Sequence, residues 1–183
     1  LSLTLSIFPY LAQANQPELP PVPCVEGAEP LPLSYGEHTT GCEIGLPVDA
    51  DHFSFFGSTG DKIRVIVLDT SPLAAVLEIF DPNGTRIINT TSPSVDVPLT
   101  VTGTYNVVIS DLGFDNTGGY TLALEKIPPV FTSPGIPYDA PPVSDVIDFQ
   151  MDVDFFTLNG EAGSTIRVIV LDTSPLAAVL EIF

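Results

Sequence analysis

The sequence is poor in basic residues and in the residue types on which catalytic and metal centres most often depend. Its 183 residues include no tryptophan, one methionine, two cysteines, two histidines and 5 lysines and arginines against 23 aspartates and glutamates. The formal charge of -18 repels phosphate backbones and anionic membrane surfaces, so nucleic acid is a poor partner and cations are a better one. The alternative interpretation of this charge is a solvated, self-repelling surface of a secreted protein, adapted to salt.

Helical periodicity is also missing, because no stretch repeats apolar residues at a sustained spacing of 3.6 among helix formers. Instead, 19 prolines and 14 glycines punctuate short runs of valine, isoleucine and leucine. This pattern is typical of short strands and frequent turns, and it predicts an all-β fold. Disorder is disfavoured because 44% of the residues are hydrophobic, which supplies a core to offset the chain entropy.

An internal repeat organises the chain. Residues 63–80, IRVIVLDTSPLAAVLEIF, return without a change as residues 166–183. The constant offset of 103 residues also aligns Asp51 with Asp154 and Phe53 with Phe156, which indicates a duplicated module whose second copy is partial. So long an identical run is explained either by gene conversion or by a mis-joined assembly, and both explanations stay open.

The composition divides the chain into five segments. Because the sequence begins at Leu rather than Met and the second module is cut short, we expect it to be a fragment of a longer protein. The apolar start ends in Ala12-Gln13-Ala14, a pattern that signal peptidase accepts, and it is too short to span a membrane. The expected segments are a signal peptide remnant at 1–14, a proline-rich linker at 15–34, a complete module at 35–127, a second proline-rich linker at 128–142 and a partial second module at 143–183.

Cys24 and Cys42 are the two cysteines of the chain. After export into an oxidising compartment such a pair usually forms a disulfide, and a bridge closing a loop of this size adds about 3 kcal/mol in the loop-entropy picture. Two free thiols or a metal pair are the competing interpretations. The second copy has Asp145 in place of Cys42, so the predicted bridge belongs to the first module alone.

Alternating side chains predict the strands of the complete module. Phe53 and Phe55 share one face of a strand, and Tyr105, Val107 and Ile109 share one face of another. The expected strands are residues 51–56, 63–68, 75–80, 85–89, 95–101, 104–109 and 120–124, with Pro98 placing its strand at an edge. Strands at this spacing indicate a β-sandwich.

Five short motifs in order carry a family resemblance. They are Asp49, Asp51, Phe53 and Phe55; Gly60-Asp61; residues 77–84, LEIFDPNG; Gly103-Thr104-Tyr105; and Gly119-Tyr120-Thr121-Leu122. The set resembles the bacterial pre-peptidase C-terminal domain over residues 35–127, and again over 138–183 in tandem. The resemblance implies a jelly-roll-like antiparallel β-sandwich in secreted, non-catalytic modules, some of which, resembling collagen-binding domains, bind calcium and extracellular matrix. His52 and Phe155 depart from the residue usual between the second Asp and the Phe.

Paired carboxylates are the candidate metal ligands. Asp49 and Asp51 lie two residues apart, so both side chains point to one side of a strand, and Asp152 with Asp154 repeats the arrangement. Hard oxygen donors of this kind suit calcium. The alternative is a pair that accepts hydrogen bonds from backbone amides at the start of the strand.

Two further polar groups have simpler expected roles. Asp111, Asp115 and Asn116 fall in a glycine-rich loop, where solvation is favoured over a ligand role. Asp69 and Asp172, each followed by Thr-Ser-Pro, are expected to begin a turn.

Catalysis is not expected within this chain. A hydrolytic triad needs a base oriented by a carboxylate and a nucleophile on a positioned turn, and neither His38 nor His52 has such a sequence setting. The sequence contains no HExxH, P-loop or GxGxxG motif.

The sequence therefore predicts a non-catalytic extracellular or cell-surface β-sandwich repeat. It would act as a spacer, a stabilising element or an adhesion module of a larger secreted bacterial protein, contacting extracellular protein, polysaccharide or neighbouring domains. The alternative is a calcium-dependent substrate-binding accessory module of a secreted peptidase or other hydrolase whose catalytic domain lies outside these residues.

Overall fold

The computed structural model describes residues 12–13, 19–127, 135–138, 141–144, 154, 156–172 and 178–182. They belong to two compact units, of which the larger comprises Gln16–Thr132 with Phe149–Val153. No helix is present among these residues, so none of them belongs to a helix long and apolar enough to cross a membrane. The larger unit is built from two β-sheets.

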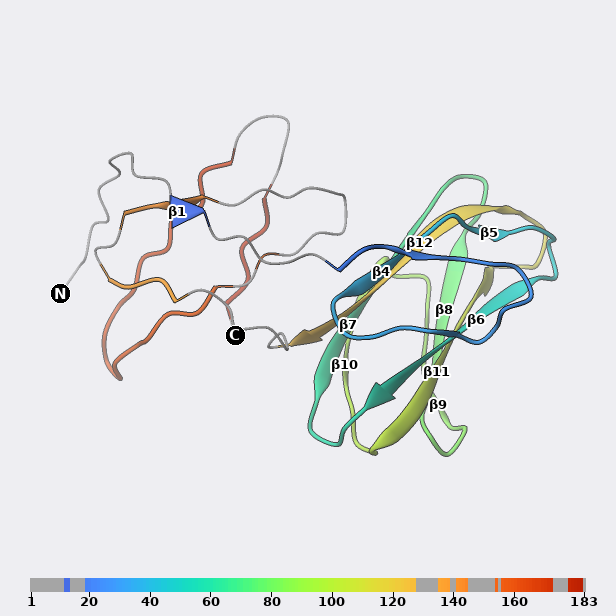
Figure 1. Cartoon of the computed structure of the whole chain (residues 1–183), viewed down its shortest axis with the longest axis horizontal. Coiled ribbons are helices and arrows are strands. Elements are labelled where there is room, and N and C mark those ends of the chain that lie inside the picture. Colours follow the sequence, from blue (N-terminus) through green and yellow to red (C-terminus); the bar gives the residue numbers. More distant parts are fainter. Residues whose placement is uncertain are drawn as a thin grey trace. The chain divides into compact units, whose positions relative to one another are not determined.

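The two sheets face one another as a sandwich (Figure 1). One sheet has the order β10 (Ser94–Pro98), β7 (Lys62–Asp69), β12 (Gly118–Ile127), β4 (Glu37–Thr40) and β2 (Val22–Pro23), with β5 (Cys42–Ile44) also paired to β12. The other has the order β3 (Leu31–Pro32), β6 (Ala50–Gly57), β11 (Gly103–Asp111), β8 (Ala75–Phe80) and β9 (Arg86–Thr90). The all-β sandwich predicted from the sequence is confirmed.

The core lies between the sheets because inward and outward side chains alternate along each long strand. On β7, Ile63, Val65 and Val67 are buried while the residues between them are partly exposed. Phe55 of β6 stacks on Tyr105 of β11 with ring centroids 5.2 Å apart. This dry interior provides the main favourable free energy of folding.

The structure contains a strand for each of the seven expected ranges. The strand β8 has the expected bounds, Ala75–Phe80, and β10 lies at the edge of its sheet, where Pro98 loses no ladder hydrogen bond. The strand β10 ends at Pro98, earlier than expected, and the chain then turns so that Leu99 is buried.

The proline-rich segment before the module contains two short strands, one in each sheet. The strand β2 pairs in parallel with β4, and β3 pairs in parallel with β6, so this segment crosses from one sheet to the other. Leu33 is buried in the core at its end. Prolines are tolerated here because both strands lie at sheet edges, where a missing N–H leaves no partner unpaired.

A disulfide between Cys24 and Cys42 joins this segment to β5 across a sequence separation of 18 residues. The expected bridge is thus present. It fixes residues 24–30 over the end of the sandwich at which β6 begins.

The smaller unit contains less regular structure among its described residues. Strand β1 (Ala12–Gln13) pairs in parallel with β13 (Val143–Ser144), and Gly135 forms a bridge with Thr157. The described part of 156–182 includes no strand. The Asp172 carboxylate accepts a bond from the Ala178 N–H, as Asp69 does from Ala75 in the first copy. A partial second sandwich stays a prediction.

Candidate functional site

Three carboxylates meet at the end of the sandwich where β6 begins. Oxygens of Glu26, Asp49 and Asp51 all lie within 4.8 Å of one another. Asp49 ends the β5–β6 turn, Asp51 is the second residue of β6, and Glu26 belongs to the segment that the disulfide fixes. The structure thus brings together the expected pair and adds a third acidic side chain.

Asp51 is the buried member of this group. It points to the core face of β6 with Phe53 and has only 5% of its surface exposed. The Tyr120 hydroxyl, from β12 in the facing sheet, donates a hydrogen bond to its carboxylate. Burial raises the pKa of Asp51 to about 6; the bond from Tyr120 opposes this increase, and the nearby Glu29 and Asp49 add to it. Burial and Asp51 also raise the pKa of Tyr120.

Asp49 is the partly buried member of this group. One carboxylate oxygen accepts a hydrogen bond from the Ala50 N–H at 3.0 Å, and the other accepts one from the Gly45 N–H at 3.3 Å. These are the backbone contacts of the alternative interpretation made from the sequence. They fix the Asp49 carboxylate and leave it within 4.8 Å of the carboxylates of Glu26 and Asp51.

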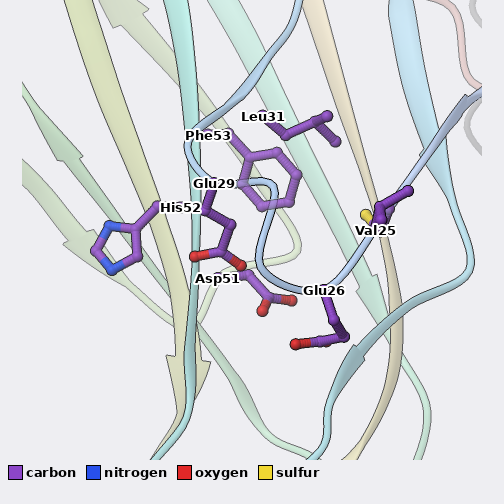
Figure 2. Close-up of a pocket in the computed structure, with 8 residues that line it drawn as sticks. Val25, Glu26, Glu29, Leu31, Asp51, His52 and Phe53 are labelled. Atoms are coloured by element: carbon purple, nitrogen blue, oxygen red, sulfur yellow. The ribbon is translucent and has the colours of Figure 1, made fainter.

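A small pocket adjoins the carboxylates (Figure 2). Its cavity volume of ≈ 10 Å³ is about the space of one water molecule. The side chains of Glu26, Glu29 and Asp51 lie on one side of the β6 ribbon, whereas the His52 ring points away from them. The pocket is lined by Cys24, Val25, Glu26, Glu29, Leu31, Asp51, His52 and Phe53.

The arrangement suits a hard cation. Calcium takes carboxylate oxygens at roughly 2.3–2.6 Å, so two ligands on opposite sides of one ion lie about 5 Å apart. The carboxylate oxygens of Glu26, Asp49 and Asp51 lie within 4.8 Å of one another, which is compatible with that spacing. Without a cation, three like charges repel one another, and the buried Asp51 carboxylate bears most of the cost of desolvation.

The second expected pair, Asp152 and Asp154, stays a prediction. Asp152 lies outside the described residues, and Asp154 is partly buried in the smaller unit. Glu26 and Glu29, by contrast, were missed by the sequence reasoning. The signal that could have found Glu26 is the predicted disulfide, because Glu26 follows Cys24 by two residues and must stay close to the bridge.

Asp111 organises the neighbouring loop. Its buried carboxylate accepts hydrogen bonds from the backbone N–H groups of Asp115 and Asn116 at 3.0 Å and of Ala74 at 3.2 Å. Burial acts to raise the pKa of Asp111, but these backbone donors outweigh it and the pKa is lowered. Asp111 is thus a loop anchor, whereas the sequence favoured a solvated residue.

Comparisons with known proteins give structural similarities at low sequence identity. No family model matches the chain, and no curated protein matches it in sequence. A periplasmic lysozyme inhibitor of g-type lysozyme from Aeromonas hydrophila aligns at 14% identity with a TM-score of 0.46, covering 52% of this chain and 94% of the other.

Two further solved structures are similar. The corresponding inhibitor from Salmonella Typhimurium aligns at 17% identity with a TM-score of 0.39, over 52% of this chain and 96% of its own. The pre-peptidase C-terminal domain of collagenase from Bacillus anthracis aligns at 10% identity with a TM-score of 0.41, over 58% and 98%.

Proposed function

We propose that residues 19–127 form a non-catalytic β-sandwich module, closed by a disulfide, in an exported bacterial protein. The module acts as a spacer between domains, as a stabilising element or as a binding module. The observation that carries this proposal is the Cys24–Cys42 bridge. It closes a segment across both sheets, and such bridges persist in oxidising compartments outside the cytosol.

The placement of the ionisable groups supports a non-catalytic role. The two histidines lie on different sheets, His38 on β4 and His52 on β6. Asp51, the carboxylate with the raised pKa, is only 5% exposed and accepts a hydrogen bond from Tyr120, and the pocket beside it has space for about one water molecule rather than a substrate. The proline-rich composition of residues 128–142 suits a linker between modules.

The experiment is to produce the full chain with an export signal, and in parallel without one, in a bacterial host. The exported chain should contain no free thiol and should resist limited proteolysis between residues 19 and 127. Added reductant should expose the segment at 24–33 to cleavage first, since the bridge fixes that segment. Two free thiols in the exported, protease-resistant chain would contradict the proposal.

A second function is favoured by the carboxylate cluster, namely calcium binding by Glu26, Asp49 and Asp51. A calcium ion would compensate the charge of the buried Asp51 carboxylate and would join the disulfide-fixed segment to β6. Calcium would then stabilise the end of the sandwich from which the loops project, as in an accessory module that holds a substrate for an attached hydrolase.

The test is a calcium titration of the EGTA-treated full chain by calorimetry, together with its thermal unfolding. At a calcium concentration of 100 times Kd, linkage predicts about 2.7 kcal/mol of added stability. Glu26→Gln should weaken binding, whereas Glu43→Gln, on the exposed side of β5, should not. An unchanged melting temperature at millimolar calcium would leave the spacer role alone.

A further inference from the structure

Two loops lie side by side at the end of the sandwich where β6 begins. Residues 45–49 connect β5 to β6, and residues 112–117 connect β11 to β12. Ile44 pairs with Gly118, and Ala50 pairs with Ser110. Each end of one loop is therefore bound beside an end of the other, and both loops bridge the two sheets.

These loops expose large apolar side chains. The exposed fractions are 65% for Leu46, 77% for Val48, 57% for Leu112 and 57% for Phe114. We name these four residues the apolar tip. A single exposed apolar residue is ordinary, but four on two adjacent loops form the kind of patch that marks an interaction site.

The backbone at Phe114 is held in an unfavourable conformation. Its φ of 57° lies in the left-handed region, which bulky side chains rarely adopt. The Asp111 anchor keeps it there, through the Phe114 N–H bond to the Asp111 carbonyl and the carboxylate bonds to Asp115 and Asn116. Backbone strain of this kind in a fixed loop is typical of functional positions. Asparagine or glycine would adopt this conformation more easily than phenylalanine.

Charge is distributed unequally between the two ends of the sandwich. The lysines and arginines of the sandwich lie toward the opposite end, and each forms an ion pair with an acidic residue. The pairs are Lys62 and Arg64 with Asp96, Lys126 with Asp61, and Arg86 with Glu78. The end that bears the apolar tip has acids alone among its formally charged described residues, including Glu26, Glu43, Asp49, Asp51, Asp69 and Asp115. A negative field surrounds the tip, and this field attracts cationic surfaces.

We propose that the apolar tip is a docking surface for a partner protein segment that presents large apolar side chains flanked by lysine and arginine. Phe114 and Leu112 pack against these apolar side chains, and the surrounding acids pair with the lysines and arginines. This deepens the proposed module function, on which it rests, by naming the chemistry of the partner. A lipid surface is the less favoured occupant because anionic headgroups are repelled by the same acids.

The probe is a random-peptide library displayed on phage and selected on the immobilised, calcium-free full chain. Peptides that combine basic with large apolar residues should be enriched, and raised salt should weaken their binding. The double variant Leu112→Ser with Phe114→Asn should lose at least about 10-fold in affinity for them. Phe56→Thr, which changes a 64% exposed phenylalanine on β6, is the matched control and should bind like wild type.

Three outcomes would overturn the proposal. The first is that no peptide is enriched, or that the enriched peptides lack basic residues. The second is equal binding to wild type and to the tip variant. The third is that vesicles of phosphatidylcholine, alone or mixed with phosphatidylglycerol, sediment with wild type but not with the tip variant, which assigns the surface to lipid.

A stability measurement separates this docking role from a structural one. The tip variant should melt at the same temperature as wild type or higher, since asparagine adopts the left-handed region more readily than phenylalanine. A clear fall in its melting temperature would instead make Phe114 a packing residue. Thiol content and protease resistance should stay unchanged in this variant, so the failure of docking and the failure of the module proposal are distinguishable.

Discussion

Replacing Asp51 by asparagine should stabilise the calcium-free protein at neutral pH. The asparagine side chain would keep an oxygen for the hydrogen bond from the Tyr120 hydroxyl and would remove a buried charge near Glu29 and Asp49. The rise of the Asp51 pKa from 3.8 to about 6 corresponds to about 3 kcal/mol, at about 1.36 kcal/mol per pKa unit. This figure is the largest stabilisation we expect from the substitution.

The stabilisation by the Asp51→Asn substitution should depend on pH within a defined range. The folded protein binds the Asp51 proton more tightly than the unfolded chain does, because the folded pKa is the higher one. The free energy of unfolding that Asp51 contributes therefore falls as pH rises from about 4 to about 6, and it is level above that window. Wild type and D51N should be about equally stable near pH 4 and differ most above about pH 6.5.

Urea unfolding of both proteins in EGTA, followed by circular dichroism across this range, measures the difference directly. Subtracting the two curves removes the contribution of the other carboxylates. With calcium added, wild type should gain stability and D51N should gain little, so the gap between them should narrow or reverse. The reasoning is refuted if D51N is the less stable protein above about pH 6.5 without calcium, or if the difference does not vary with pH.

Two core positions give further predictions. Tyr105→Phe should cost about 1–3 kcal/mol in urea unfolding, because the buried hydroxyl donates to the Val101 carbonyl at 2.6 Å and accepts from the Val101 N–H at 3.2 Å; an unchanged midpoint would contradict this. Gly57→Ala should lower the free energy of unfolding by about 1–3 kcal/mol, since the added Cβ would meet Leu99 and the Tyr105 ring; a variant as stable as wild type would show that the site has free space.

The strands of the sandwich could be predicted because their signals are local. The run of residues 63–68, apolar except for Arg64, and the turn residues that follow residue 80 are signals within a few residues, so the predicted bounds of β7 and β8 were close to those observed. The placement of Asp51 beside Phe53 on the core face also followed from the period of two along a strand.

The N-terminal segment could not be predicted in the same way. The strands β2 and β3 have two residues each, include proline and pair in parallel with distant strands, so they leave no periodic signal. Glu26 reaches Asp51 only through that long-range pairing and the disulfide. Tyr120 reaches Asp51 from the facing sheet, and residue order alone does not specify the contact.

The most direct test of the account is whether residues 19–127, with the Cys24–Cys42 bridge intact, unfold as one cooperative unit. We expect a single urea transition for this fragment. The double variant Cys24→Ala with Cys42→Ala should lose about 3 kcal/mol of unfolding free energy, since the bridge closes a separation of 18 residues. A gradual, non-cooperative transition of the oxidised fragment, or equal stability of the two proteins, would contradict the account.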